Sequence, residues 1–337
     1  MTLRVRPALV ALVLCFFVSA APVAADDVEL AGGTHLEGIV LAEGEHDVHL
    51  LLAGGDEVHL ARADVATVDR RADAPKKGQH LRYREPTDTT AGGLDVAVTT
   101  WLAPEGGPRV DLVGAVHLAD ASFFRAVQRR LDRVDVTLFE AVLPEGATTK
   151  DLENGTTRSA NEPLRALQKR MATWLGLTFQ LEGIDYTRPH FVHADMTAEE
   201  FTAEMGGEPG GDAKLPASLK MAMKLLEMAG PMMDRIMGDD ERSGPLRKRL
   251  KRQLASTLGS TEVQGMLGAL GAKMTDVILH RRNDVALAKV DEVEATQGVR
   301  SIAVFYGAAH LEGIEKGLEA RGYRRGGAEW LTAWSVE

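Results

Sequence analysis

The sequence predicts an α/β protein with a mainly parallel or mixed central sheet flanked by helices, a Met-rich helical insertion and a small β-barrel-like domain at the N-terminus. Three observations predict this fold. From residue 80 onward, short apolar strands alternate with amphipathic helices. Before that point, runs rich in Val and Leu are separated by Gly-containing turns. Nine of the 12 methionines lie between Met205 and Met274. A chain of 337 residues can bury one sizeable core and carry an appendage.

Residues 1–25 have the layout of an export signal. Two arginines precede an apolar run, residues 8–21, and small residues precede a cut before Asp26. A retained membrane anchor is the alternative, but a run of 14 residues is shorter than the ~20 that span a bilayer. We therefore expect an exported protein, periplasmic or secreted, whose mature chain has lost its only cysteine, Cys15.

The composition excludes several classes of function and site. Lys and Arg number 39 against 49 Asp and Glu, so a formal charge of −10 provides no basic field for a nucleic acid. A mature chain without cysteine holds no disulfide and no thiolate metal site. Any metal must therefore be bound by His, Asp or Glu.

Residues 26–75 are predicted to form a small all-β module, a barrel of the SH3- or Sm-like kind. Short runs rich in Val and Leu stand at 28–30, 38–41, 48–52 and 57–60. A barrel of about 45 residues has no room for a deep active site, so we expect an accessory module that docks an envelope protein partner. The polar stretch 70–78 is predicted to be the linker.

The α/β domain, residues 80–337, is predicted to open with a hairpin and to continue in βα units. Its strands are expected at 94–101, 109–113, 134–139, 302–306 and 330–336, and its helices around 124–131, 164–174 and 311–321. Residues 197–290 are predicted to be a helical insertion or lid. Met side chains suit an adaptable surface that faces a substrate or a lipid, and an irregular core with Met as filler is the alternative.

One local pattern, Gly-x-x-His, occurs twice after a predicted strand and before an amphipathic helix, in Gly114 to His117 and in Gly307 to His310. Gly permits a tight turn and a close backbone approach. Each His is then expected at the carboxyl edge of the sheet, where open α/β folds bind ligands. Glu140 follows the strand 134–139 and leaves a parallel sheet on the same side.

Two imidazoles and a carboxylate suit a divalent metal with vacant positions for water and substrate, so His117, Glu140 and His310 are the predicted ligands. Without a third His, the set favours Mn²⁺ or Co²⁺ over Zn²⁺. A single Gly-x-x-His is more typical of a helix-capping junction, and its repetition is what favours a site.

Arg282 and Asn283 are adjacent polar residues before the last βα unit. An Arg beside an Asn can fix a substrate carbonyl or carboxylate and stabilise developing negative charge. The alternative is a helix start that Asn283 or Asp284 caps, with exposed arginines.

These features together resemble the TraB, or TraB/PrgY, family, which is related to the TIKI proteins and more distantly to the ChaN-like and erythromycin-esterase-like groups. The resemblance covers about residues 92–337. Its markers, in the family's order, are Gly114 to His117, Phe139-Glu140, Arg282-Asn283 and Gly307 to His310, and the segments Ile184-Asp185-Tyr186 and Phe191 to Met196 are also similar.

The resemblance implies an α/β fold with a metal-dependent hydrolase site, and it brings the peptidase activity attributed to the TIKI branch. On this analogy His117, Glu140 and His310 are metal ligands or immediate catalytic groups, and Arg282 and Asn283 position the substrate. Secondary candidates are Asp185, Tyr186 and Asp195, of which Asp195 is an alternative to Glu140 as the proton relay.

The expected function is therefore an exported hydrolase that acts on peptides or small molecules. Its bound divalent ion would lower the pKa of a water and polarise a carbonyl. A non-catalytic protein of the cell envelope that binds haem or another small ligand is the alternative, implied by the ChaN-like relatives, with the Met-rich helices as cover. A third idea is an envelope scaffold with a degenerate site.

Overall fold

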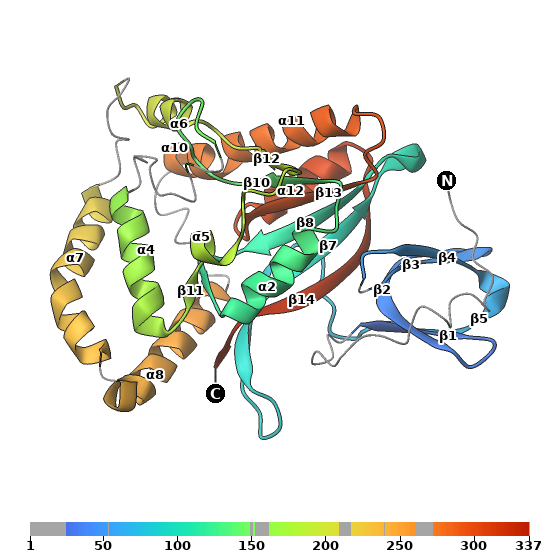
Figure 1. Cartoon of the computed structure of the whole chain (residues 1–337), viewed down its shortest axis with the longest axis horizontal. Helices are drawn as coiled ribbons and strands as arrows, with labels where there is room; N and C mark the ends of the chain where they lie inside the picture. Colours follow the sequence, from blue (N-terminus) through green and yellow to red (C-terminus); the bar gives the residue numbers. More distant parts are fainter. Residues whose placement is uncertain are drawn as a thin grey trace.

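The structure, a computed structural model, describes residues 25–52, 54–148, 151, 162–208, 217–238, 240–260 and 272–336. The predicted export signal lies almost entirely outside these residues. Within the described ranges, no helix has both the length and the apolar content that crossing a bilayer requires. The fold is α/β: a mixed central sheet is flanked by helices, and a separate antiparallel sheet lies at the N-terminus (Figure 1).

The N-terminal sheet has five antiparallel strands in the order β4-β3-β2-β1-β5. They are β1 (Asp26–Leu30), β2 (His35–Glu43), β3 (Asp47–Leu52), β4 (Glu57–Ala61) and β5 (Val65–Asp69). All four predicted runs fall within strands. The prediction of a barrel was wrong, because among the described residues β4 and β5 are the two edges of an open sheet. Alternation specifies a buried face, whereas closure depends on strand tilt and stagger, which the residue pattern does not encode.

Both faces of this sheet are partly covered. One face holds its own core, with Val28, Val40 and Leu50 fully buried. On the other side, Ile39, Leu41 and Leu51 are buried with Leu102 of the central sheet packed against them. The N-terminal sheet therefore rests on the α/β domain and does not hang free of it.

The central sheet has the strand order β12-β10-β13-β8-β7-β14, and β6 also pairs with β7. The strands are β6 (Leu81–Arg84), β7 (Gly92–Leu102), β8 (Arg109–Ala115), β10 (Val136–Phe139), β12 (Phe191–His193), β13 (Ser301–Gly307) and β14 (Arg324–Val336). The four from β12 to β8 are parallel, and β7, β14 and β6 add antiparallel pairs. The predicted hairpin and final strand are thus confirmed within a mixed sheet.

Helices cover both faces of the central sheet. On one face, α2 (Ala121–Leu131) and α8 (Asp240–Leu258) contribute Phe124 and Ala255 to the core that contains Phe305. On the other face, α11 (Arg282–Glu294) and α12 (Leu311–Ala320) pack on Val304. Because α11 belongs to this layer, the last part of the predicted insertion, residues 282–290, is part of the α/β fold itself.

The other α-helices among the described residues are α4 (Glu162–Leu175), α5 (Gln180–Gly183), α6 (Ala198–Glu204), α7 (Ala217–Met237) and α10 (Ala272–Thr275). Helices α4, α7 and α8 contact one another and form a group at one side of the molecule (left in Figure 1). Within the described residues Met205, Met237 and Met274 are buried. Met221, Met228 and Met232 on α7 are exposed. The segment thus uses Met both in cores and on an exposed helix face.

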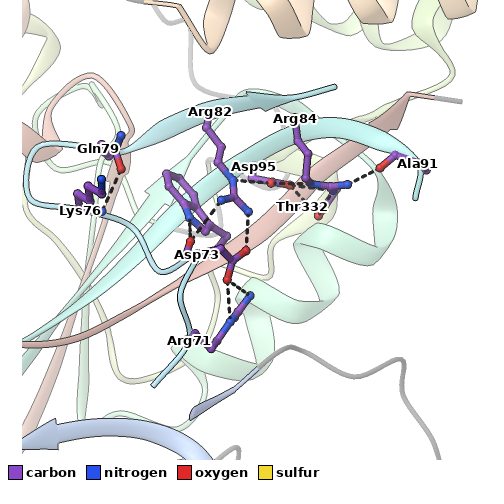
Figure 2. A network of polar contacts seen from close by, with 10 residues as sticks. Arg71, Asp73, Lys76, Gln79, Arg82, Arg84, Ala91, Asp95 and Thr332 are labelled. Carbon is purple, nitrogen blue, oxygen red and sulfur yellow. Dashed lines mark hydrogen bonds and ion pairs between the residues drawn. The ribbon is translucent and has the colours of Figure 1, made fainter. Parts of the chain in front are cut away.

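The predicted linker is fixed to the central sheet by a polar network (Figure 2). The carboxylate of Asp73 accepts hydrogen bonds from Arg71 (3.1 Å) and Arg82 (3.2 Å), and the Trp330 indole donates to the Asp73 carbonyl (2.8 Å). Arg82 also binds the buried Asp95 of β7 (2.9 Å). The linker therefore holds the N-terminal sheet against the α/β domain.

Candidate functional site

Three predicted site residues follow neighbouring strands at one edge of the sheet. In the parallel ladders Gly307 of β13 pairs with Ala115 of β8, and Phe305 pairs with Phe139 of β10. Glu140 comes directly after β10, His117 comes two residues after β8 and His310 three residues after β13, so all three lie at the carboxyl edge, as the sequence predicts.

Glu140 is the most heavily bonded of the three. Its Oε1 accepts from the Arg282 guanidinium (2.6 Å) and lies 3.4 Å from His310 Nε2, and its Oε2 accepts from the Gly307 backbone N–H (2.5 Å). Burial alone would raise the pKa of this carboxyl, but the charges of Arg282 and His310 and the hydrogen bonds hold the pKa well below its ordinary value. Glu140 is therefore an anion throughout the neutral range.

Arg282 joins two carboxylates that are far apart in the sequence. Besides Glu140, it forms a two-pronged pair with Asp195, from Nε to Oδ1 (2.8 Å) and from Nη2 to Oδ2 (2.6 Å). The Asp195 side chain is fully buried. Burial on its own would lower the pKa of Arg282, but Glu140 and Asp195 raise it, so the guanidinium stays charged.

Helix geometry delivers Arg282 to this position. A π-helical turn, Asp276–Arg281, runs directly into α11, and Arg281 has helical backbone angles. Asn283 and Asp284 therefore do not cap a helix start, and that alternative was wrong. Turns of this kind occur often at functional sites, because the extra residue redirects the side chains that follow.

His310 precedes α12 and is held by Asn283. Its Nδ1 lies 2.7 Å from Asn283 Oδ1, and Asn283 Nδ2 donates to the His310 carbonyl (3.4 Å). Because the amide nitrogen faces a carbonyl, the amide oxygen must accept, and His310 Nδ1 carries the hydrogen. The Nε2 atom therefore faces Glu140 and is available to a proton or an ion. Both polar atoms of Asn283 are used on His310.

His117 is held in the same manner by a residue that sequence reasoning missed. Its Nδ1 lies 3.2 Å from Gln180 Oε1, and Gln180 Nε2 donates to the Tyr186 hydroxyl (2.9 Å). This orientation again assigns the hydrogen to Nδ1 and leaves Nε2 available. The imidazole is exposed. A Gln in α5 carries no local sequence signal, since only β11 (Thr178–Phe179) pairing with β9 (Leu118–Ala119) brings it near.

That small sheet also corrects the placement of His117. The sequence predicts a helix directly after it, but β9 follows and α2 begins at Ala121. Only His310 stands at a helix start. The two glycines of the Gly-x-x-His segments let neighbouring side chains lie close to the backbone. A Cβ at Gly114 would lie 2.4 Å from Val96 Cγ1, and one at Gly307 would lie 3.1 Å from Glu140 Oε2.

The secondary candidates have different environments. Asp195 belongs to the Arg282 cluster described above. Asp185 closes a turn by accepting from the Thr187 N–H (2.9 Å) and hydroxyl (2.5 Å), and its own N–H donates to Gln128. Tyr186 is buried edge-on against Phe139, and burial raises the pKa of its hydroxyl. Tyr306, which the sequence did not single out, donates from its hydroxyl to the Ala194 carbonyl.

The donor chemistry of His117, Glu140 and His310 fits a divalent ion, since two imidazoles present Nε2 and one carboxylate is ionised. Their spacing fits less well. Among the described residues, the ligand atoms of this set do not all lie within 4.8 Å of one another. The Glu140–His310 pair is assembled, and His117 stands apart at the same edge.

Comparison of the chain with protein-family models, with curated proteins and with solved structures finds no match.

Proposed function

We propose that this chain is an exported, metal-dependent hydrolase of the peptidase type, with a peptide or a related small molecule as substrate. The observation that carries the proposal is the Glu140–His310 pair, in which an ionised carboxylate faces an imidazole whose other nitrogen is bound by Asn283. Such an oriented pair offers an ionised carboxylate oxygen and an imidazole nitrogen to a divalent ion, and the carboxylate can take up a proton from a water molecule. No cysteine and no serine is needed as nucleophile, because water takes that role.

The surrounding residues support this chemistry. Arg282 keeps Glu140 ionised and oriented, and Asn283 fixes the tautomer of His310, so both are positioning residues in this proposal. The backbone N–H of Gly307 fixes the second oxygen of Glu140. Asp195 is the buried counter-ion of Arg282 and so fixes the position of the guanidinium that binds Glu140.

A divalent ion, Mn²⁺ or Co²⁺ before Zn²⁺, would be held by His117, Glu140 and His310. When bound, it would polarise a substrate carbonyl and lower the pKa of a water molecule. His117 is the exposed member, so its side chain is the ligand that packing restrains least. The N-terminal sheet is proposed as the docking module for an envelope protein, and the Met-rich helices before α11 as the cover of the site.

The test uses the mature chain, residues 26–337, produced without a His tag. Metal content is measured, and cleavage of a peptide library is compared with chelator, with Mn²⁺ and with Co²⁺. We expect metal-stimulated cleavage that His117→Ala and His310→Ala each abolish, while far-UV circular dichroism stays unchanged. His46→Ala, which replaces an exposed histidine in the turn between β2 and β3, is the matched control.

Normal peptide cleavage in His117→Ala or in His310→Ala would contradict the proposed metal-dependent site. Absence of cleavage together with a Soret band after haem addition would replace the hydrolase with a ligand-binding protein.

A further inference from the structure

A second group of metal-binding side chains lies in the N-terminal sheet, away from the edge just described. His49 of β3 stands directly opposite His59 of β4, and Glu57 is two residues before His59 and so on the same face. The His49 and His59 rings stack with centroids 4.1 Å apart, and His49 Nε2 lies 2.9 Å from Glu57 Oε2. Among the described residues, this is the one set of three whose ligand atoms all lie within 4.8 Å of one another.

Glu57 is fixed by a buried partner from the central sheet. The Arg109 guanidinium, at the start of β8, binds Glu57 Oε1 and also lies 3.2 Å from Asp111. Burial would raise the pKa of Glu57, but His49 and Arg109 hold it below its ordinary value. The carboxylate is thus ionised, and Arg109 occupies one oxygen while the other faces His49. A hydrogen bond to the second oxygen of a carboxylate, such as the one from Arg109, fixes the orientation of the oxygen that binds a metal.

We propose that His49, Glu57 and His59 form a binding site for Zn²⁺, with further coordination positions open to solvent. Two imidazole nitrogens and one carboxylate oxygen are the donor set that Zn²⁺ accepts in open sites. The ion takes the place of the hydrogen between His49 Nε2 and Glu57 Oε2, and in the neutral imidazole that hydrogen moves to Nδ1.

The charges around the set fit one cation. Asp47 lies 3.6 Å from His59 Nδ1 and adds negative charge on the exposed side. Arg109 is the opposing positive charge, and Asp111 partly compensates it. Because Arg109 belongs to the central sheet, a bound ion would stiffen the hairpin of β3 and β4 and its contact with the α/β domain together.

The test is designed to separate this site from the one at the sheet edge. A His117→Ala/His310→Ala background, without a His tag and treated with chelator, is titrated with ZnCl₂ by calorimetry. We expect one equivalent of Zn²⁺ to bind in this background. The stoichiometry should fall to zero when His59→Ala is added. Glu57→Gln should weaken binding about tenfold or more.

His59 is about 40% exposed, so its replacement should leave the zinc-free unfolding midpoint unchanged. His46→Ala, three residues before His49, is the control and should bind as the background does. Absence of zinc binding in the background overturns the proposal, and so does unchanged binding in the His59→Ala protein. Neither result bears on peptide cleavage, which depends on the other site.

Discussion

Replacement of Arg282 by Met tests the buried charge cluster that supports the proposed site. Met has a similar length and no charge, so the change removes the cation and keeps most of the packing. Two carboxylates then lose their shared partner. Asp195, whose side chain is fully buried, loses both of its guanidinium bonds, whereas Glu140 keeps Gly307 and His310.

The magnitude follows from what remains buried. Removal of one member of a buried ion pair costs ~3–5 kcal/mol, because the remaining charge has no compensation. We expect a loss of this size in the free energy of unfolding, which for a chain of this length corresponds to a fall in Tm of roughly 5–8 °C. Arg282→Lys keeps the charge without the planar fork and should lose less.

The assay is urea unfolding of residues 26–337 followed by circular dichroism, extended to a double-mutant cycle. Asp195→Asn removes the charge that Arg282→Met leaves behind, so the double variant should be less destabilised than the sum of the singles by about 2 kcal/mol. The pH dependence has a defined sign. Glu140 has a lowered pKa in the folded state, so its stabilisation is present above the ordinary value of 4.5 and is lost as pH falls through the folded-state pKa.

In Arg282→Met the largest favourable cause of the lowered Glu140 pKa is removed, while His310 and Gly307 remain. The difference in free energy of unfolding between the parent and the variant should therefore narrow as the solution is acidified below pH 4.5. A loss below about 1 kcal/mol, or strict additivity with Asp195→Asn, would refute the view that these three charges act as one buried unit.

Three further expectations concern separate parts of the structure. Asn283→Ala should remove the hydrogen-bond partner of His310 Nδ1 and lower the rate of peptide cleavage about 10–100-fold. If the nitrogen NMR shifts of His310 in this variant remain those of the Nδ1–H tautomer, Asn283 does not fix that tautomer. Burial lowers the pKa of His80 from 6.5 to about 4, so between these pH values the unfolded chain binds more protons than the folded chain. The free energy of unfolding should therefore fall by up to about 3 kcal/mol as the pH drops through this range. The pH dependence of the free energy of unfolding should be weaker in His80→Gln, and an equal dependence in both proteins would contradict the role of His80. Gly114→Ala should cost ~1–3 kcal/mol in urea unfolding, because its Cβ would meet Val96, and a neutral result would show that the strands adjust freely.

The strands and most helices could be predicted from periodicity, because each element buries one face and the spacing of apolar residues records that face. The position of the site residues at one edge of the sheet could also be predicted from the sequence. Glu140 follows an apolar strand directly and His310 comes three residues after one, and the ends of parallel strands share one edge. A polar residue after a buried strand is a local signal, so one sequence is enough to find it.

Contacts between distant segments were not predictable in this way. Gln180 reaches His117 only through the β9–β11 pair, and Asp195 meets Arg282 across 87 positions of chain. The eight-residue separation of His49 and Glu57 gave no metal signal, because only the register of β3 against β4 places the two side chains together. Register and side-chain rotamers are set by packing, which a residue pattern does not contain.

The sequence by itself determined which segments are strands and helices and which polar residues end them, since these properties depend on a few neighbouring residues. The tertiary structure alone decided that the N-terminal sheet stays open against the α/β domain, that Arg282 serves two carboxylates, and that two carboxamides orient the two histidines. Each of these outcomes rests on long-range packing, where the free energy of burying one surface is shared among segments that are far apart in the chain.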